Sequence, residues 1–172
     1  MAQRKPQFLS IHQPEDILPA FGLDESDLFP NSVIQTVSTG TPQLMILLKD
    51  LQSLRKASPN LEKYALLRNT SDFFSPHLFC LQGIEHGRTF ARDFGLPPDT
   101  LEDPFTGSAT GGMAAYLWHY GLIENPTFIA EQGHWMSRPG KAYVEVIGPR
   151  EDIQTVKVGG AAVTVLKGEL TI

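Results

Sequence analysis

Residues 102–118 read Glu102-Asp103-Pro104-Phe105-Thr106-Gly107-Ser108-Ala109-Thr110-Gly111-Gly112 and then, without a break, Met113-Ala114-Ala115-Tyr116-Leu117-Trp118. The apolar run predicts a helix. Ser108 or Thr106 is a natural N-cap, because a hydroxyl oxygen can accept a hydrogen bond from a free N–H of the first turn. Gly121 fits the left-handed residue that ends a helix. Since apolar residues lie nearly all round this helix, we expect it to be buried.

The start of such a helix is suited to binding an anion. Its first amides have no partner within the helix, and the helix dipole adds roughly half a positive charge there. We therefore expect a carboxylate or phosphate to rest on the amides of Gly107 and Ser108. The alternative is a capped core helix without a ligand, and spacing alone favours that alternative, because helix starts are common and few bind anything.

Composition excludes several classes of protein. The chain has 172 residues, of which 41% are hydrophobic and 19% charged, which is typical of a globular domain. Its net charge is −5 and it has no basic run, which argues against nucleic acid or an anionic membrane surface as partner. The single cysteine, Cys80, allows no internal disulfide and no thiolate metal cluster. No apolar run approaches the roughly 20 residues of a membrane span, and the first residues lack the apolar core of a secretory signal. We expect a cytoplasmic protein.

The order of elements predicts an α+β fold with a strongly curved mixed sheet wrapped around the central helix. β-Branched or apolar runs bounded by turn residues predict the strands. The segment Ala142–Ile147 is expected to pair with either Thr155–Val158 or Ala162–Leu166. Residues 1–30 resemble an arm, and residues 31–172 form the domain. The predicted strands are 7–11, 33–37, 44–48, 77–82, 89–94, 127–132 and 142–147.

The block Glu-Asp-Pro-x-Thr-Gly-Ser-Ala at residues 102–109 resembles the signature of the phenazine-biosynthesis F-type (PhzF-like) isomerase family. Further matches lie in register around it, from residue 30 onward. They are Ser38-Thr39-Gly40-Thr41-Pro42, Arg88-Thr89-Phe90-Ala91, Gln132-Gly133 with Arg138-Pro139-Gly140, Val158-Gly159-Gly160-Ala161-Ala162-Val163, and Lys167-Gly168-Glu169-Leu170.

The resemblance implies a fold of two half-barrels like that of diaminopimelate epimerase, each wrapped around its own helix, with the active site between them. This chain resembles only the second, C-terminal half, so residues 1–30 would be the tail of the missing first half or the crossover. The resemblance implies a reaction in which a proton shifts on a carbon skeleton that bears a carboxylate. This reaction needs no metal and no organic cofactor. A glutamate and a Gly-His block of the first half contribute to the family's site, and neither is found here.

Carried over residue by residue, the resemblance implies that Asp103 contacts the substrate. Gly107 and Ser108 would hold its polar end, while Glu102 and Thr106, the other expected substrate-binding residues, would shape the turn. The alternative for Asp103 is a loop acid that caps a nearby amide. Asp93-Phe94-Gly95 matches a kinase metal motif, but no glycine-rich or catalytic loop accompanies it, so we interpret it as chance.

Three functions remain open. The chain is the C-terminal half of an isomerase, inactive without a separate first-half polypeptide; or a homodimer in which two copies rebuild the site with Asp103 or Glu102 as acid/base; or an inactive module that binds a small acid. All three predict a small carboxylate ligand and an exposed apolar face that associates with another polypeptide.

Overall fold

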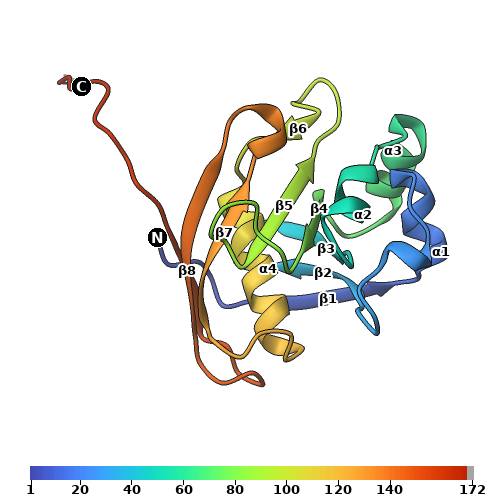
Figure 1. The fold of residues 1–172 in the computed structure, drawn as a ribbon, viewed down its shortest axis with the longest axis horizontal. Helices are drawn as coiled ribbons and strands as arrows, with labels where there is room; N and C mark the ends of the chain where they lie inside the picture. Colours follow the sequence, from blue (N-terminus) through green and yellow to red (C-terminus); the bar gives the residue numbers. More distant parts are fainter. Residues whose placement is uncertain (170–172) are drawn as a thin grey trace.

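The computed structural model describes residues 1–169 (Figure 1). The strands are β1 (Gln7–His12), β2 (Ile34–Ser38), β3 (Pro42–Leu47), β4 (Ser75–Cys80), β5 (Thr89–Phe94), β6 (Glu102–Asp103), β7 (Thr127–Gln132), β8 (Gly140–Ile147) and β9 (Thr155–Gly159). The helices are α1 (Pro14–Ile17), α2 (Leu51–Lys56), α3 (Leu61–Thr70) and α4 (Gly107–His119), with 3₁₀ turns η1 (Leu18–Phe21), η2 (Glu25–Asp27) and η3 (His134–Met136).

The strands form one curved mixed sheet, and α4 packs against it (Figure 1). Its order is β1-β2-β3-β4-β5-β7-β8-β9, and the short β6 pairs with β5. The pairs β3–β4 and β5–β7 are parallel and the others antiparallel. The expected α+β class with a curved, half-barrel mixed sheet and few helices is confirmed.

The first residues of the chain bring the two ends of the sheet together. Ala2 forms a bridge with Lys157 of β9, and the backbone N–H of Gln3 donates to the carbonyl of Val156 over 2.9 Å. A few residues later the same segment becomes β1 and pairs with β2 at the other end of the sheet. This connection nearly closes the sheet, and it was not expected from the sequence.

Helix α4 is buried at every residue from Ala109 to Leu117. It packs against β2, β3, β8 and β9. The close fit explains Gly112, where a Cβ would lie 2.7 Å from the Cε of Met45. Tyr116 anchors the helix, because its hydroxyl donates to the carbonyl of Val33 over 2.6 Å. After the helix, Gly121 has the expected left-handed conformation, with φ of +69°.

A second apolar core lies on the opposite face of β2–β5, under the short helices α1–α3 and η1 (Figure 1). Side chains alternate between the faces of a strand. In β3, for example, Leu44 and Ile46 belong to this outer core, while Met45 and Leu47 pack towards α4. Residues from 1–30 contribute to both the sheet and this core through β1 and the buried side chains of α1 and η1.

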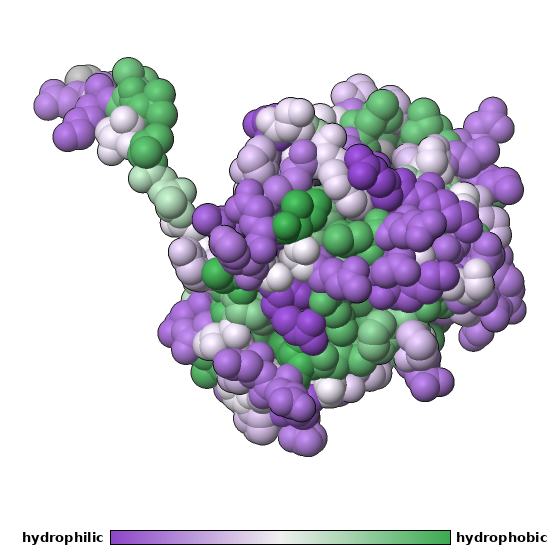
Figure 2. All heavy atoms as spheres, viewed as in Figure 1, coloured by the Kyte–Doolittle hydropathy of each residue, from purple (hydrophilic) through white to green (hydrophobic). Residues whose placement is uncertain are grey.

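The chain beyond β9 does not form the strand that one of the two expected pairings of Ala142–Ile147 required. Strand β8 pairs with β9, as one of the two alternatives had it, and residues 162–166 form no strand. Residues 160–169 leave the sheet and stand away from the body (Figures 1 and 2). Leu170, the last residue of the motif match at residues 167–170, lies outside the described residues. Among residues 1–169, no helix has the length and hydropathy needed to cross a membrane.

Candidate functional site

A hollow of about 350 Å³ opens at the N-terminus of α4. Three residues expected at the site line it, namely Asp103, Thr106 and Ser108. Its inner wall comes from neighbouring strands, with Gln43 of β3, Ser75 of β4 and Asp93 of β5. The fold thus places the start of the buried helix beside a space large enough for a small molecule.

The first amides of α4 lie beside this space, which Ser108 lines and Gly107 does not, and they have no acceptor. Within residues 1–169, no hydrogen bond is recorded for the backbone N–H groups of Gly107 or Ser108. Thr106 occupies the N-cap position, as one of the two expectations had it, but its side chain makes no capping bond. Its hydroxyl instead donates to Asp103 Oδ2 over 2.7 Å. Ser108 is the second helical residue and not the cap. The helix start is therefore available to an external anion.

Asp103 lies at the end of β6 and takes part in the turn that leads into the helix. Besides the hydroxyl of Thr106, its carboxylate accepts a long 3.4 Å hydrogen bond from the backbone N–H of Phe105. Each carboxylate oxygen can accept more than one hydrogen bond, so Asp103 keeps acceptor capacity towards the hollow. Asp103 can therefore shape the turn and still present an acceptor to the hollow.

Gln132 of β7 holds this turn from behind. Its side-chain N–H donates to the carbonyl of Asp103 over 2.8 Å, and its Oε1 accepts from the backbone N–H of Thr106 over 3.2 Å. The following Gly133 has φ of +83°, and a Cβ there would lie 2.5 Å from the carbonyl oxygen of Pro104. The Gln-Gly pair that matched the family motif thus supports the turn directly.

Glu102 lies away from the hollow and is not among its lining residues. Its carboxylate binds Arg92 through two hydrogen bonds, Nε to Oε1 at 2.9 Å and Nη2 to Oε2 at 2.8 Å. Arg92 also donates to the carbonyl of Ala57 over 2.7 Å. Glu102 therefore ties β6 to β5 and to the end of α2, while its neighbour Asp103 faces the hollow.

Sequence reasoning missed the buried polar residues of the inner wall. Ser75, His77 and Asp93 are all buried and joined by hydrogen bonds. A usable signal was present in β4, because Ser75 and His77 are polar residues at alternate positions of an otherwise apolar strand. Asp93 had been noted only as part of a chance motif.

A second acidic cluster, Glu85, Glu131 and His134, has ligand atoms within 4.8 Å of one another. Both oxygens of Glu131 are already engaged by the backbone N–H groups of residues 84–87, at 2.6–3.0 Å. Burial raises the pKa of Glu131, but these amides outweigh it, and the net pKa lies below the usual value. The loop of residues 84–87 thus satisfies the carboxylate by itself, and the arrangement is typical of a structural anchor.

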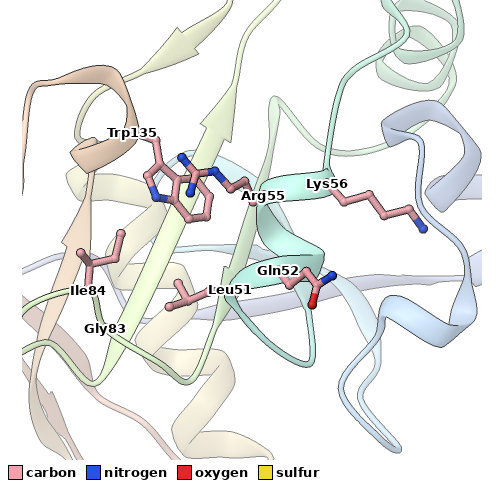
Figure 3. Close-up of a pocket in the computed structure, with 7 residues that line it drawn as sticks. All are labelled: Leu51, Gln52, Arg55, Lys56, Gly83, Ile84 and Trp135. Carbon is pink, nitrogen blue, oxygen red and sulfur yellow. The ribbon is translucent and has the colours of Figure 1, made fainter.

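Another hollow, of about 680 Å³, lies beside α2 and contains no expected site residue. Figure 3 shows the guanidinium of Arg55 against the ring of Trp135, and its carbon lies 5.1 Å from the ring centre. Leu51 and Ile84 form the apolar part of this wide, open depression.

Comparison with known proteins gives the class to which this fold and site belong. The sequence profile of the PhzC-PhzF family, described as phenazine biosynthesis-like protein, matches residues 2–168. The chain therefore belongs to this family, and the likeness extends over nearly the whole chain, including residues before the motifs recognised from residue 30 onward.

Individual relatives support the same family assignment. An uncharacterized isomerase of Clostridium acetobutylicum is 36% identical over 184 residues, covering 100% of this chain and 60% of the relative. The trans-2,3-dihydro-3-hydroxyanthranilate isomerase of Pseudomonas fluorescens is 28% identical, covering 100% of this chain and 58% of the relative. The crystal structure of the PhzF-family protein of Bacillus anthracis superposes with a TM-score of 0.80 at 28% identity, covering 100% of this chain and 60% of that chain. The chain thus spans about 60% of the length of these relatives.

Proposed function

We propose that this chain supplies the carboxylate-holding half of an isomerase site that shifts a proton on a small acid without a cofactor or metal. The observation that carries the proposal is the pair of unpaired amides of Gly107 and Ser108, together with the hollow that Ser108 and Asp103 line. A carboxylate there gains hydrogen bonds and the favourable end of the helix dipole. The isomerase names of the relatives support the reaction class.

In this proposal each residue has a distinct task. The amides of Gly107 and Ser108, with the serine hydroxyl, hold the carboxylate. Asp103 accepts a hydrogen bond from a donor group elsewhere on the substrate, and Thr106 keeps the Asp103 carboxylate oriented through its 2.7 Å hydrogen bond. Glu102 acts at a distance, because its ion pair with Arg92 fixes the strand that carries Asp103.

We further propose that the chain corresponds to the C-terminal half of its relatives, with the diaminopimelate epimerase-like architecture of one half-barrel around one helix. Residues 1–30 would then come from the end of the first half or the crossover. The coverage of about 60% of each relative supports this view. The missing part would carry the glutamate that completes the proton shift, so the chain alone is expected to give no isomerisation.

The C-terminal segment supports association with another polypeptide. Val163, Val165 and Leu166 are 85–90% exposed, and Figure 2 shows apolar side chains along this segment. Exposed apolar residues in a row are typical of a surface that another chain covers. The partner would be a first-half polypeptide or, in the homodimer alternative, a second copy. Sedimentation analysis of the pure chain distinguishes a monomer from a dimer.

The test of the proposed function is a calorimetric titration with anthranilate, a stable aromatic carboxylate. Ser108→Pro removes one amide at the second helical position, where proline is tolerated. We expect at least tenfold weaker binding for this variant and for Asp103→Ala. Glu62→Pro, at the same position of α3, is the matched control and should bind like the wild type. Equal affinity in all variants would refute the site assignment.

A further inference from the structure

Asp93 lies directly across the sheet from Asp103. The antiparallel pairing of β5 with β6 sets these two residues opposite each other, and both line the hollow at the start of α4. Directly opposed residues on antiparallel strands have Cβ atoms about 4.5–5.5 Å apart. Asp103 is half-buried, whereas Asp93 is only 4% exposed. The hollow therefore contains a second carboxyl group, deeper than the one already proposed to bind substrate.

Asp93 is held by neighbours that are themselves buried. Its Oδ2 lies 3.0 Å from Nδ1 of His77, and its Oδ1 lies 2.9 Å from the hydroxyl oxygen of Ser75. That hydroxyl oxygen is also 2.5 Å from Oε1 of Gln43. The Nε2 atom of His77 has no hydrogen-bond partner among residues 1–169. The network therefore runs from Gln43 through Ser75 to Asp93 and ends at the imidazole.

This network satisfies Asp93 in either of its protonation states. When Asp93 is ionised, the amide of Gln43 can present its NH₂ to Ser75, whose hydroxyl then donates to Asp93. When Asp93 is protonated, it can donate to Ser75, whose hydroxyl then donates to the Gln43 oxygen. The two states differ by one proton, a hydroxyl rotation and an amide flip.

No lysine or arginine within residues 1–169 forms an ion pair with Asp93, and its only ionisable partner there is His77. A carboxylate fixed only for structure would gain more from a permanent cation, as Glu102 does from Arg92. Buried titratable groups that border a cleft are candidates for proton transfer. Asp93 borders the hollow, belongs to a buried hydrogen-bond network and lies opposite Asp103. Together these features indicate a role in proton transfer as well as in stability.

We infer that Asp93 is the proton-exchanging group of this half of the site, with Ser75 and His77 as the residues that position it. The inference rests on the proposed function, because it needs a carboxylic acid bound at the start of α4. In the step, a carbon–hydrogen bond of the bound acid breaks and the proton goes to an Asp93 oxygen. The electron pair remains on the conjugated skeleton of the acid. Reversal of the step returns a proton that Asp93 has exchanged with water.

The test uses the full chain with trans-2,3-dihydro-3-hydroxyanthranilate in deuterium oxide, and NMR follows deuterium uptake at carbon. The wild type should catalyse uptake, and Asp93→Asn should lower the rate at least 100-fold, the lower end of the range for acid–base groups. Affinity for anthranilate should stay within twofold, because the amides of α4 are unchanged. Ser75→Ala should lower the exchange rate about tenfold without loss of affinity.

Asp16→Asn is the matched control, since Asp16 is an exposed acid of α1 that does not line the hollow. It removes the same charge and should leave exchange unchanged. Circular dichroism establishes folding, and if Asp93→Asn does not fold, Ser75→Ala decides the question. The inference is overturned if the wild type binds anthranilate without catalysing exchange, or if folded Asp93→Asn or Ser75→Ala exchanges at the wild-type rate. A chain that fails to bind anthranilate refutes the proposed function itself.

Discussion

The side chain of Gln132 donates to the carbonyl oxygen of Asp103 over 2.8 Å, and this contact joins β7 to the turn that starts α4. The same amide accepts from the backbone N–H of Thr106. Gln132 is buried, so water cannot replace these bonds. The position of the helix amides relative to Asp103 therefore depends on a residue that is not among those lining the hollow.

The first prediction concerns this amide. Gln132→Met keeps the length of the side chain but removes its donor and acceptor. We expect unfolding free energy to fall by about 2 kcal/mol, since the backbone groups of Asp103 and Thr106 lose their partner. Anthranilate affinity should fall about tenfold. Urea unfolding and calorimetry measure the two effects, and Gln52→Met, at an exposed position of α2, is the control. Unchanged affinity in a stably folded variant would contradict the positioning role.

The second prediction concerns the anchor of α4. The hydroxyl of Tyr116 donates to the carbonyl of Val33 and accepts from its N–H, at 2.6 and 3.2 Å. Tyr116→Phe leaves both backbone groups without a partner and should cost about 1–3 kcal/mol of stability. Tyr143→Phe, at a residue that is 61% exposed, should cost nothing measurable. Thermal unfolding of the two variants checks the difference, and equal melting temperatures would show that the buried hydroxyl contributes nothing.

The third prediction concerns pH. The four amides of residues 84–87 lower the pKa of Glu131 below its ordinary value of 4.5. A lowered folded-state pKa means that the stabilisation is complete above pH 4.5 and is lost as the pH falls through the lower folded value. Glu131→Gln should therefore cost about 2–3 kcal/mol at pH 7, and its deficit relative to the wild type should shrink below pH 4.5.

Urea unfolding at a series of pH values measures that deficit. Glu124→Gln provides the control, because Glu124 is exposed and should show no such dependence. A deficit that stays constant from pH 7 to below pH 4.5 would disprove the assignment to the Glu131 carboxylate.

The fourth prediction concerns the single thiol. Burial raises the pKa of Cys80 to about 11, so little thiolate is present at neutral pH. Iodoacetamide at pH 8 should modify the native chain at least 100-fold more slowly than the urea-unfolded chain. Mass spectrometry follows the labelling. Rapid modification of the native protein would mean that Cys80 is accessible and activated.

Local signals in the sequence predicted much of the fold. Asn60 caps α3, since its side chain accepts from the backbone N–H of Lys63, and Gly22 has the left-handed conformation that ends η1. The buried helix was predictable because its apolar residues lie on all sides. These features depend on neighbours in sequence, so pattern and capping chemistry suffice to find them.

Long-range features were less predictable. The pairing of Ala2 with Lys157 joins the N-terminal segment to β9, and no local pattern specifies it. Thr106 was expected to cap the helix, but its hydroxyl bonds to Asp103, an alternative that only the folded turn offers. Asp93 was overlooked because its meaning comes from Ser75 and His77 on the neighbouring strand. The residues of the turn were found by resemblance, and the wall facing them required the structure.

The most direct test of the account is a nitrogen-15 NMR titration of the wild-type chain with anthranilate. The central claim is that the free amides at the start of α4 bind a carboxylate. It predicts saturable shifts of the Gly107 and Ser108 amide signals, with the Gly121 amide beyond the other end of the helix unchanged. Saturable binding that leaves Gly107 and Ser108 unshifted, or no binding at all, would contradict the claim.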